Sequence, residues 1–245
     1  MTGAAVSVRG LHKKFGDDEV LADIGLQVPR GEITLLMGPN GVGKTILLSC
    51  IAGGLHPDEG EIRVFGSSPA AADERLSFML QDSMLVEELT GRENVNFFRD
   101  LHPKSTDEVE EILQRLDFEM DALEREVGDY SGGMKRKLEL AVSLSVDVAL
   151  YLLDEPTAAL DMTTVEQLHA MLSARREAGE TVVISSHLPT DADLADHIAV
   201  VTERGISAVG SPEDLLDAVP PVVLAEGPVD IREHVRAGGL FEGEI

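Results

Sequence analysis

The sequence predicts an α/β protein with a mostly parallel sheet at its core and an inserted helical segment. Short apolar runs at Glu32–Met37, Val148–Leu153 and Thr181–Ser185 are typical of strands buried on both faces. Helical patterns separate the later runs, and strands that alternate with helices favour parallel pairing. From about Leu85 to Ser145 the apolar residues fall at helical spacing instead, which indicates the insertion. We therefore expect ligands beyond the carboxyl ends of the strands.

The first part of the chain is predicted to place strands on either side of a glycine-rich loop. In order, we expect strand Val6–Arg9, loop His12–Glu19, strand Leu21–Val28, turn Pro29-Arg30-Gly31, strand Glu32–Met37, loop Gly38–Gly43, helix Lys44–Ala52, and strands Ile62–Phe65 and Ser77–Leu80. Apolar runs bounded by glycine and proline support these strands. The pair Gly53-Gly54 is expected to end the helix.

The second part is predicted to be helical first and then to alternate. We expect helices Glu93–Leu101, Asp107–Leu116 and Met134–Ser145, strand Val148–Leu153, helix Thr163–Arg176, strand Thr181–Ser185, helix Thr190–Ala195 and strand Ile198–Thr202. Glu203-Arg204-Gly205 is typical of a hairpin turn, and Ser211-Pro212-Glu213 opens a short helix. The tail Ala218–Ile245 has clusters of Pro and Gly without a clear period, and the sequence predicts no role for it.

The composition argues against several classes of function. Asp and Glu number 45 against 20 Lys and Arg, a net charge of −25, and aromatic residues make up only 4%. This negative field and the scarcity of stacking side chains oppose binding to nucleic acid or to an anionic membrane surface. The acidic surface, with few Lys, is typical of a protein that stays soluble at high salt, where a Debye length of about 3 Å screens self-repulsion. An ordinary acidic protein at ordinary salt is the alternative.

Other features indicate where the chain works. No apolar run reaches the roughly 18–20 residues that span a bilayer, and Met1–Gly10 lacks the apolar core of a signal peptide. We therefore expect a cytoplasmic, unprocessed chain without direct membrane insertion. Cys50 is the single cysteine, which excludes an internal disulfide and a cysteine-based zinc site.

A phosphate-binding loop is predicted at Gly38-Pro39-Asn40-Gly41-Val42-Gly43-Lys44-Thr45, which fits G-x-x-x-x-G-K-[ST]. The glycines let backbone N–H groups turn inward around phosphate oxygens, and the following helix adds its positive dipole end. Lys44 would reach the β- and γ-phosphates, and Thr45 would hold Mg²⁺. A plain glycine turn is the alternative, but a strand before the loop and a helix after it favour phosphate binding.

Two carboxylates follow the buried strand that ends at Leu153. Asp154 at the strand end can ligate Mg²⁺ directly or through water. Glu155 is placed to orient and deprotonate an attacking water, and a carboxylate beside bound triphosphate should have a raised proton affinity. A surface acid without a role is the alternative interpretation of Glu155.

A third motif, Tyr130-Ser131-Gly132-Gly133-Met134, completes a set that resembles the nucleotide-binding subunits of ABC transporters. The resemblance covers Val6 to Leu216, with Gly38–Thr45 as Walker A and Ala149–Asp154 as Walker B. It implies a P-loop NTPase core of the ABC ATPase type, with an N-terminal antiparallel β subdomain and an inserted α-helical subdomain. It also implies an ATPase domain over residues 1–217, with the insertion at about 85–145, and a C-terminal extension over 218–245.

The resemblance implies further roles for single residues. Glu155 matches the catalytic glutamate, His187 the switch histidine that offers a ring N–H to the γ-phosphate, and Gln81 the Q-loop residue that reaches Mg²⁺ or the water. Ala159-Leu160-Asp161 resembles the D-loop, so Asp161 is expected at the nucleotide. Phe15 lies where an aromatic ring stacks on adenine. The Ser131, Gly132 and Gly133 loop would cradle the phosphates of a partner subunit, so that two subunits sandwich two ATP molecules head to tail.

The sequence also departs from the family pattern. Tyr130 and Met134 replace the usual Leu and Gln at the ends of the signature, and Ile46 stands where a second Thr usually follows Thr45. The basic cluster Lys135-Arg136-Lys137 could offset the negative field near the nucleotide or form a solvated helix face. The signature variant and the segment Glu87–Asn94 are similar to the type 2 exporter branch.

The resemblance therefore implies an ATP-binding and ATP-hydrolysing subunit that powers a membrane exporter and uses ATP and Mg²⁺. Its implied partners are a multi-span permease and a second ATPase subunit, identical or different, and no nucleic acid. The protein would sit on the inner face of the cell membrane through its permease. Alternatives are an importer ATPase, a soluble non-transport ABC ATPase, or a GTPase or small-molecule kinase. The last class is opposed by the absence of an Asn-Lys-x-Asp guanine motif.

Overall fold

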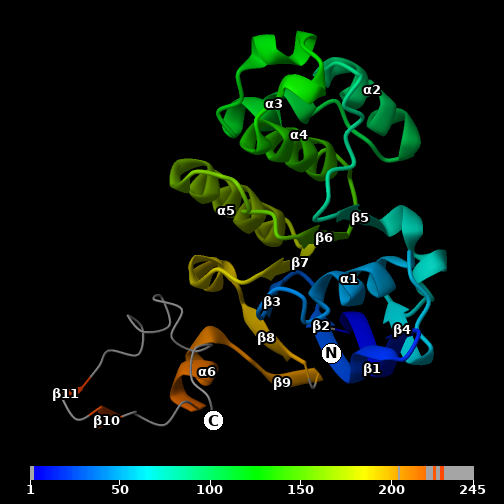
Figure 1. The fold of residues 1–245 in the computed structure, drawn as a ribbon, viewed down its shortest axis with the longest axis vertical. Helices are drawn as coiled ribbons and strands as arrows, with labels where there is room; N and C mark the ends of the chain where they lie inside the picture. The colour runs from blue at the N-terminus through cyan, green and yellow to red at the C-terminus, as the bar shows by residue number, and fades with distance from the viewer. Residues whose placement is uncertain (1–2, 204, 219–222, 225–226, 229–245) are drawn as a thin grey trace.

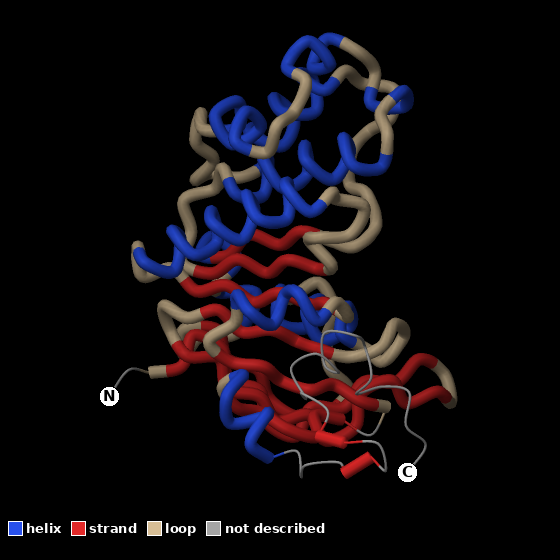
Figure 2. The backbone as a smooth tube through the Cα atoms, turned by 90° about the vertical axis from the view of Figure 1, so that its left-hand side faces the viewer, coloured by secondary structure: helices blue, strands red, loops and turns tan. Residues whose placement is uncertain are grey.

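The computed structural model describes residues 3–203, 205–218, 223–224 and 227–228. The six-stranded sheet has the order β5-β6-β7-β3-β8-β9, and helices lie on both sides of it (Figures 1 and 2). Its strands are β3 (Ile33–Met37), β5 (Leu76–Met79), β6 (Leu150–Asp154), β7 (Thr181–Ser186), β8 (His197–Thr202) and β9 (Gly205–Gly210). All neighbours pair in parallel except β8 and β9. The predicted α/β fold with a mostly parallel sheet is confirmed.

A second, antiparallel sheet of order β2-β1-β4 forms the N-terminal part. It consists of β1 (Ala4–Phe15), β2 (Asp18–Pro29) and β4 (Glu59–Val64). The prediction of a loop over His12–Glu19 is wrong, because β1 and β2 run on to a tight turn and pair Phe15 with Asp18. This end of the hairpin is largely exposed, so polar residues are tolerated there, and Glu19 links the strands through Lys14 at 3.2 Å and His12 at 3.2 Å.

The helical insertion is confirmed between β5 and β6 (Figure 1). The α-helices of the chain are α1 (Lys44–Ala52), α2 (Gly91–Leu101), α3 (Val109–Arg115), α4 (Gly132–Leu144), α5 (Met162–Glu177) and α6 (Pro212–Ala218). Short 3₁₀ helices are η1 (Pro69–Ala71), η2 (Asp73–Arg75), η3 (Met120–Glu124), η4 (Val127–Asp129) and η5 (Pro189–Leu194). The helix predicted over Thr190–Ala195 is present as the 3₁₀ helix η5, one residue earlier at each end. The segment lies directly before β8, and its backbone closes i to i−3 bonds at Asp191 and Ala195.

Two apolar clusters pack on opposite faces of the six-stranded sheet because alternate residues of each buried strand point in opposite directions. Leu35 of β3 and Leu153 of β6 join the cluster that includes α5 and the insertion. Leu36 and Leu152 join the cluster that includes α1 and the antiparallel sheet. The insertion is therefore fixed to one face of the sheet.

The C-terminal part of the chain is described only in segments. The hairpin turn predicted at Glu203-Arg204-Gly205 includes Arg204, which lies outside the described residues, and Thr202 pairs with Gly205. Helix α6 occupies the position of the predicted short helix. Beyond it, β10 (Val223–Leu224) and β11 (Gly227–Pro228) form an antiparallel pair, and the rest of the predicted tail lies outside the described residues.

Candidate functional site

Several of the predicted site residues lie at the carboxyl ends of three neighbouring strands. In the order β6-β7-β3, β6 ends in Asp154 and precedes Glu155, β7 ends in Ser186 and precedes His187, and β3 leads into the loop of residues 38–43. Parallel strands expose their carboxyl ends on one edge, so segments that are far apart in the sequence meet there.

The phosphate loop depends on two glycines for different reasons. At Gly38 a β-carbon would collide with the carbonyl oxygen of Val201. Gly43 has φ +100° at the N-cap of α1, and a β-carbon there would lie 2.8 Å from Leu21 Cδ2. No side chain caps α1 at this residue, so the helix dipole opens toward the loop. The loop geometry therefore suits an anionic ligand.

Glu155 is held between two basic groups. Its carboxylate lies 3.2 Å from Lys44 Nζ through Oε1 and 2.9 Å from His187 Nδ1 through Oε2. Lys44 also donates to the carbonyls of Gly38 at 2.7 Å and Pro39 at 3.1 Å. Glu155 has φ +48°, a region that residues other than glycine rarely adopt. The structure thus brings together three side chains that the sequence predicted to act on a phosphate, and it holds one of them in a strained conformation.

Asp154 is fully buried and receives a hydrogen bond from the Ser185 hydroxyl through Oδ1. Among the described residues its Oδ2 has no hydrogen-bond partner. Ser185 Oγ also accepts from the Glu155 N–H at 3.0 Å, so this serine positions both acids. Sequence reasoning missed Ser185, although a hydroxyl directly after the buried apolar residues 182–184 was a visible signal.

Three side chains that the sequence predicts as metal ligands, Thr45, Gln81 and Asp154, suit a magnesium ion by the chemistry of their oxygens. The Thr45 hydroxyl donates to Gln81 Oε1 at 3.4 Å, so two of the three predicted metal ligands lie side by side. The described residues contain no cluster of three or more His, Cys, Asp or Glu that could hold a metal. One orphaned carboxylate oxygen with neutral oxygens from Thr45 and Gln81 suits Mg²⁺, which commonly binds one or two carboxylates together with substrate phosphates.

The signature loop lies next to the D-loop of the same chain. The Ser131 side chain caps α4 by accepting from Met134 N–H at 3.2 Å. A β-carbon on Gly133 would lie 3.0 Å from the Ala159 carbonyl oxygen, and one on Gly132 would lie 3.8 Å from Ala159 Cβ. Figure 1 places α4 in the upper, helical part of the molecule and α1 in the lower part. Contact between Ser131 and a nucleotide therefore stays a prediction.

Asp161 caps α5 in this structure. Its carboxylate accepts from Thr164 N–H at 3.0 Å and from the Thr164 hydroxyl at 2.8 Å, and these hydrogen bonds lower the pKa of Asp161. The predicted contact of Asp161 with a nucleotide stays a prediction. Phe15 lies on the β1–β2 hairpin with 48% of its surface exposed, and Lys13 Nζ sits 5.3 Å from the ring centroid. Its ring is thus accessible to a flat ligand.

A buried network behind the site was not predicted from the sequence. Asp191, fully buried in η5, accepts from the Thr157 hydroxyl at 2.9 Å and lies 3.0 Å from His169 Nε2. Thr157 follows Glu155 by two positions, and Asp191 follows His187 by four. The network therefore ties together the two segments that carry these side chains.

The basic cluster at residues 135–137 does not form one solvated face. Lys135 pairs with Glu87, Arg136 is buried, and Lys137 donates to the Asp117 carbonyl at 3.1 Å. The three side chains thus bond to different parts of the insertion and to the segment that follows β5.

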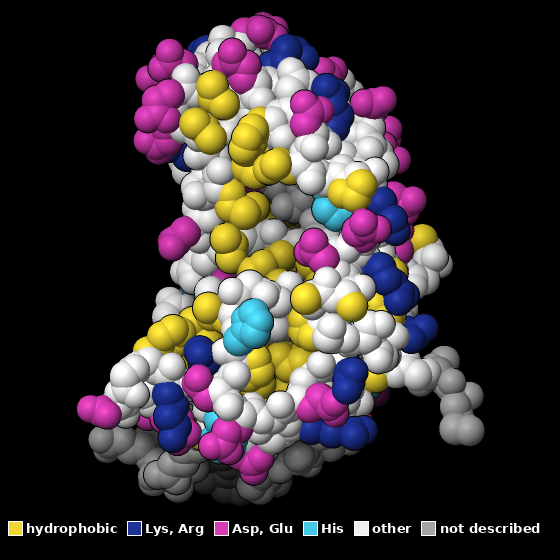
Figure 3. All heavy atoms as spheres, turned by 90° about the vertical axis from the view of Figure 1, so that its right-hand side faces the viewer, with side chains coloured by type: hydrophobic (Ala, Val, Ile, Leu, Met, Phe, Trp, Pro, Cys, Tyr) yellow, Lys and Arg dark blue, Asp and Glu magenta, His cyan; other side chains and the backbone are white. Residues whose placement is uncertain are grey.

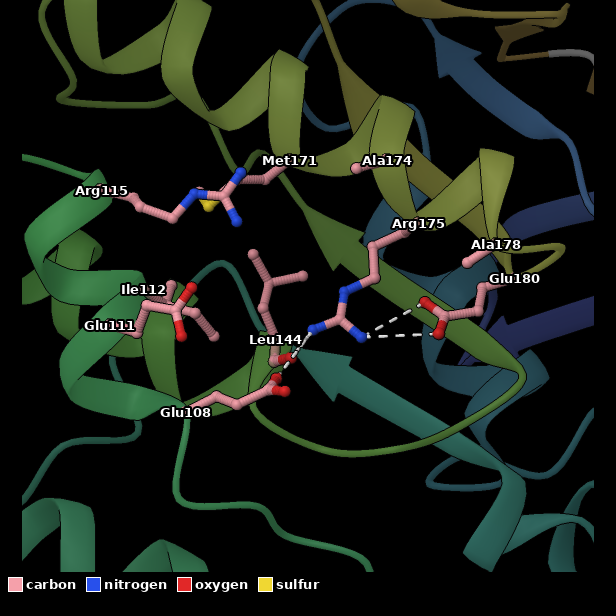
Figure 4. A pocket seen from close by; sticks show the side chains of 10 residues that line it. All are labelled: Glu108, Glu111, Ile112, Arg115, Leu144, Met171, Ala174, Arg175, Ala178 and Glu180. Carbon is pink, nitrogen blue, oxygen red and sulfur yellow. Dashed lines mark hydrogen bonds and ion pairs between the residues drawn. The ribbon is translucent and has the colours of Figure 1, made fainter.

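A pocket of about 260 Å³ lies between α3 and α5 and contains none of the predicted site residues (Figure 4). Arg175 reaches across it, donating to the Leu144 carbonyl at 2.7 Å and the Tyr151 hydroxyl at 3.1 Å. Its guanidinium also lies 3.5 Å from Glu108 and 3.4 Å from Glu180. Arg175 therefore joins the helical insertion to the core.

Comparisons with known proteins agree with these motifs. The ABC transporter family profile matches residues 21–158. The chain is 35% identical over 224 residues to a daunorubicin resistance ATP-binding protein of Streptomyces coeruleorubidus, covering 88% of this chain and 71% of that protein. It is 34% identical over 248 residues to a sulfate/thiosulfate import ATP-binding protein of Synechocystis, covering 97% and 69%. A solved ATP-binding subunit of an ABC transporter superposes with a TM-score of 0.75 at 26% identity, covering 87% of this chain and 92% of that one.

Proposed function

Since the chain belongs to the family of ABC transporter ATP-binding proteins and is therefore an ATPase, we propose that it powers a membrane exporter. The observation that carries the catalytic part of this proposal is the position of Glu155 between Lys44 and His187, at the carboxyl ends of adjacent strands. This position supports Glu155 as the base that activates water.

The chain's own residues account for the steps of hydrolysis. The phosphates of ATP draw the Lys44 ammonium away from Glu155, which leaves this carboxylate free to accept a proton from water. His187 holds the γ-phosphate through its ring N–H, and the N–H groups of the loop at residues 38–43 hold the other phosphates. Thr45, Gln81 and Asp154 would hold Mg²⁺, which would neutralise charge on the phosphates.

We place the second half of the nucleotide site on a partner subunit. The loop of Ser131, Gly132 and Gly133 begins a helix of 13 residues, and its glycines let a phosphate approach the backbone. Two subunits arranged head to tail close on two ATP molecules, and hydrolysis releases them. Phe15 supports the adenine ring, and Asp161 lies near the junction between the subunits.

A groove next to the Q-loop suits a permease. It measures about 320 Å³, and its lining includes Met84, Phe98 and Leu101. Figure 3 shows hydrophobic side chains gathered at the hollow waist between the upper and lower parts of this face. No helix among the described residues has the length and apolar character to cross a membrane. A multi-span partner seated here brings the protein to the inner face of the cell membrane.

Export is supported by the signature variant at residues 130–134 and by the relative named for daunorubicin resistance. Import is the second candidate, because another relative at similar identity is named for sulfate/thiosulfate import. Recovery of tagged Glu155→Gln from membranes in high KCl with Mg-ATP, followed by mass spectrometry, tests this choice. We expect a multi-span exporter protein in stoichiometric amount. Recovery of an importer permease, or of no membrane protein from intact complexes, would overturn the proposal.

The catalytic assignment has its own test. Glu155→Gln keeps the size of the side chain but removes its basicity, so we expect retained ATP binding and a loss of hydrolysis of about a hundredfold or more. Glu166→Gln on the exposed face of α5 is the matched control and should hydrolyse ATP like the wild type. Phosphate release measured in both variants decides the matter, and wild-type turnover in Glu155→Gln would remove this residue as the base.

A further inference from the structure

We propose that Arg136 is a positioning residue that ties the signature helix to the Q-loop and so sets the place of Gln81. This inference rests on the proposed function, because it concerns the metal site of that ATPase. Arg136 lies in the first turns of α4, five positions after Ser131. Gln81 lies on the other side of the insertion, where the chain leaves β5.

The guanidinium of Arg136 binds the Q-loop backbone directly. Its NH1 donates to the Leu80 carbonyl at 3.2 Å, and its NH2 donates to the Gln81 carbonyl at 3.1 Å. The side chain of Gln81 then meets the Thr45 hydroxyl at 3.4 Å. A continuous chain of contacts therefore runs from the signature helix through Gln81 to the predicted magnesium site.

The Arg136 side chain is buried, and its charge is paired with the Glu139 carboxylate. Arg136 is 7% exposed, and NH1 also bonds Glu139 Oε2 at 3.2 Å, one helical turn further on. A planar guanidinium can bond two successive carbonyls and a carboxylate together, whereas a lysine ammonium is a single point of charge. Arg136→Lys therefore conserves the buried charge but loses the fork that spans Leu80 and Gln81.

A second set of contacts joins the same two segments further along. Lys135 pairs with Glu87, Val127 N–H donates to the Leu89 carbonyl at 2.9 Å, and Gly128 N–H donates to the Glu87 carbonyl at 2.9 Å. These bonds hold residues 87–89 against the segment before the signature loop. Among these contacts, those of Arg136 are made at the Gln81 end of the Q-loop. A movement of the signature helix would therefore move Gln81 with it.

The first test uses the free protein. Amide hydrogen exchange over residues 80–84 should be about tenfold or more faster in Arg136→Lys, since the charge-assisted bonds to the Leu80 and Gln81 carbonyls are lost. Exchange in the strands of the six-stranded sheet should stay as in the wild type. Arg63→Met, at an exposed arginine that pairs with Glu61, is the matched control and should change neither region.

The second test separates positioning from general stability. In Arg136→Lys the Mg²⁺ concentration for half-maximal ATP hydrolysis should rise about tenfold, while the KM for ATP at saturating Mg²⁺ stays within about twofold. In a Gln81→Ala background the same substitution should no longer move the Mg²⁺ dependence. If Arg136→Lys unfolds, the double variant Arg136→Met/Glu139→Met removes both members of the buried ion pair. Hydrogen exchange and the Mg²⁺ dependence of hydrolysis are then measured on that variant.

The outcomes are distinguishable. Unchanged exchange over residues 80–84, or a Mg²⁺ effect that persists in the Gln81→Ala background, overturns the role of Arg136. Wild-type protein that does not hydrolyse ATP would instead overturn the proposed function, and the exchange result would still decide whether Arg136 holds the Q-loop.

Discussion

Replacing Ser185 with alanine should remove the hydrogen bond that the described residues give to the Asp154 carboxylate. Ser185 is fully buried in β7, donates to Asp154 Oδ1 and accepts from the Glu155 N–H at 3.0 Å. Asp154 Oδ2 already has no hydrogen-bond partner among these residues. The substitution therefore leaves a fully buried carboxylate without the donor that stabilises its charge.

The size of the effect follows from the charge of the acceptor. A hydrogen bond to an ionised group contributes about 1.5–3 kcal/mol to stability, against about 0.5–1.5 kcal/mol for a neutral pair. The Glu155 N–H keeps its hydrogen bond to the Ser185 carbonyl at 3.2 Å. Losing its second acceptor, the Ser185 hydroxyl, therefore adds little to the cost. We expect a decrease of about 2 kcal/mol in the free energy of unfolding. For a chain of this length that corresponds to a Tm lower by about 4–8 °C.

Ser77 offers a matched control in the neighbouring part of the sheet. Its hydroxyl is buried and donates to the neutral Ser143 carbonyl at 2.8 Å, so Ser77→Ala should cost about 1 kcal/mol. Denaturant unfolding of both variants, at one salt concentration and without nucleotide, measures the two free energies. The Ser185→Ala effect should shrink in an Asp154→Asn background, because the acceptor is then neutral.

Two results would refute this reasoning. Ser185→Ala that is no less stable than Ser77→Ala would show that the charge of Asp154 does not depend on this donor. An undiminished effect in the Asp154→Asn background would show that Ser185 acts through packing rather than through the carboxylate. Either result would also weaken the view that Ser185 positions the two acids for catalysis.

Burial raises the pKa of the Cys50 thiol to about 11, so a thiol reagent such as dithionitrobenzoate should react only when the protein unfolds; rapid stoichiometric reaction in native buffer would contradict this. Burial also raises the pKa of Tyr151 to about 12 and that of Tyr130 above its ordinary value. Because the chain has 2 Tyr and no Trp, absorbance at about 295 nm should show both ionising above pH 10 when folded and near pH 10 when unfolded. A raised folded pKa stabilises the native state below pH ~10, and this stability is lost as pH rises toward 12. Tyrosine ionisation near pH 10 in folded protein would contradict the burial.

Local chemistry made much of the fold readable from the sequence. The strands β3, β6 and β7 are buried throughout, so they are rich in apolar residues and stand out against their neighbours. The phosphate loop is also local, because its glycines and the start of α1 follow each other directly along the chain. By contrast, the β1–β2 hairpin escaped prediction where its strands are exposed, since an exposed strand needs no apolar pattern.

Each predicted side chain could be recognised by its motif, but its neighbours depended on the packing of distant segments. Glu155 meets His187 because β6 and β7 are adjacent, and Lys44 reaches the same carboxylate from the start of α1. Arg136 has the same charge as the residues on either side of it, yet it alone turns inward to the Q-loop carbonyls. A motif specifies which groups are present and how the local backbone turns. Which partner a buried charge finds is decided by tertiary packing, because that charge must be paired wherever the surrounding elements exclude water.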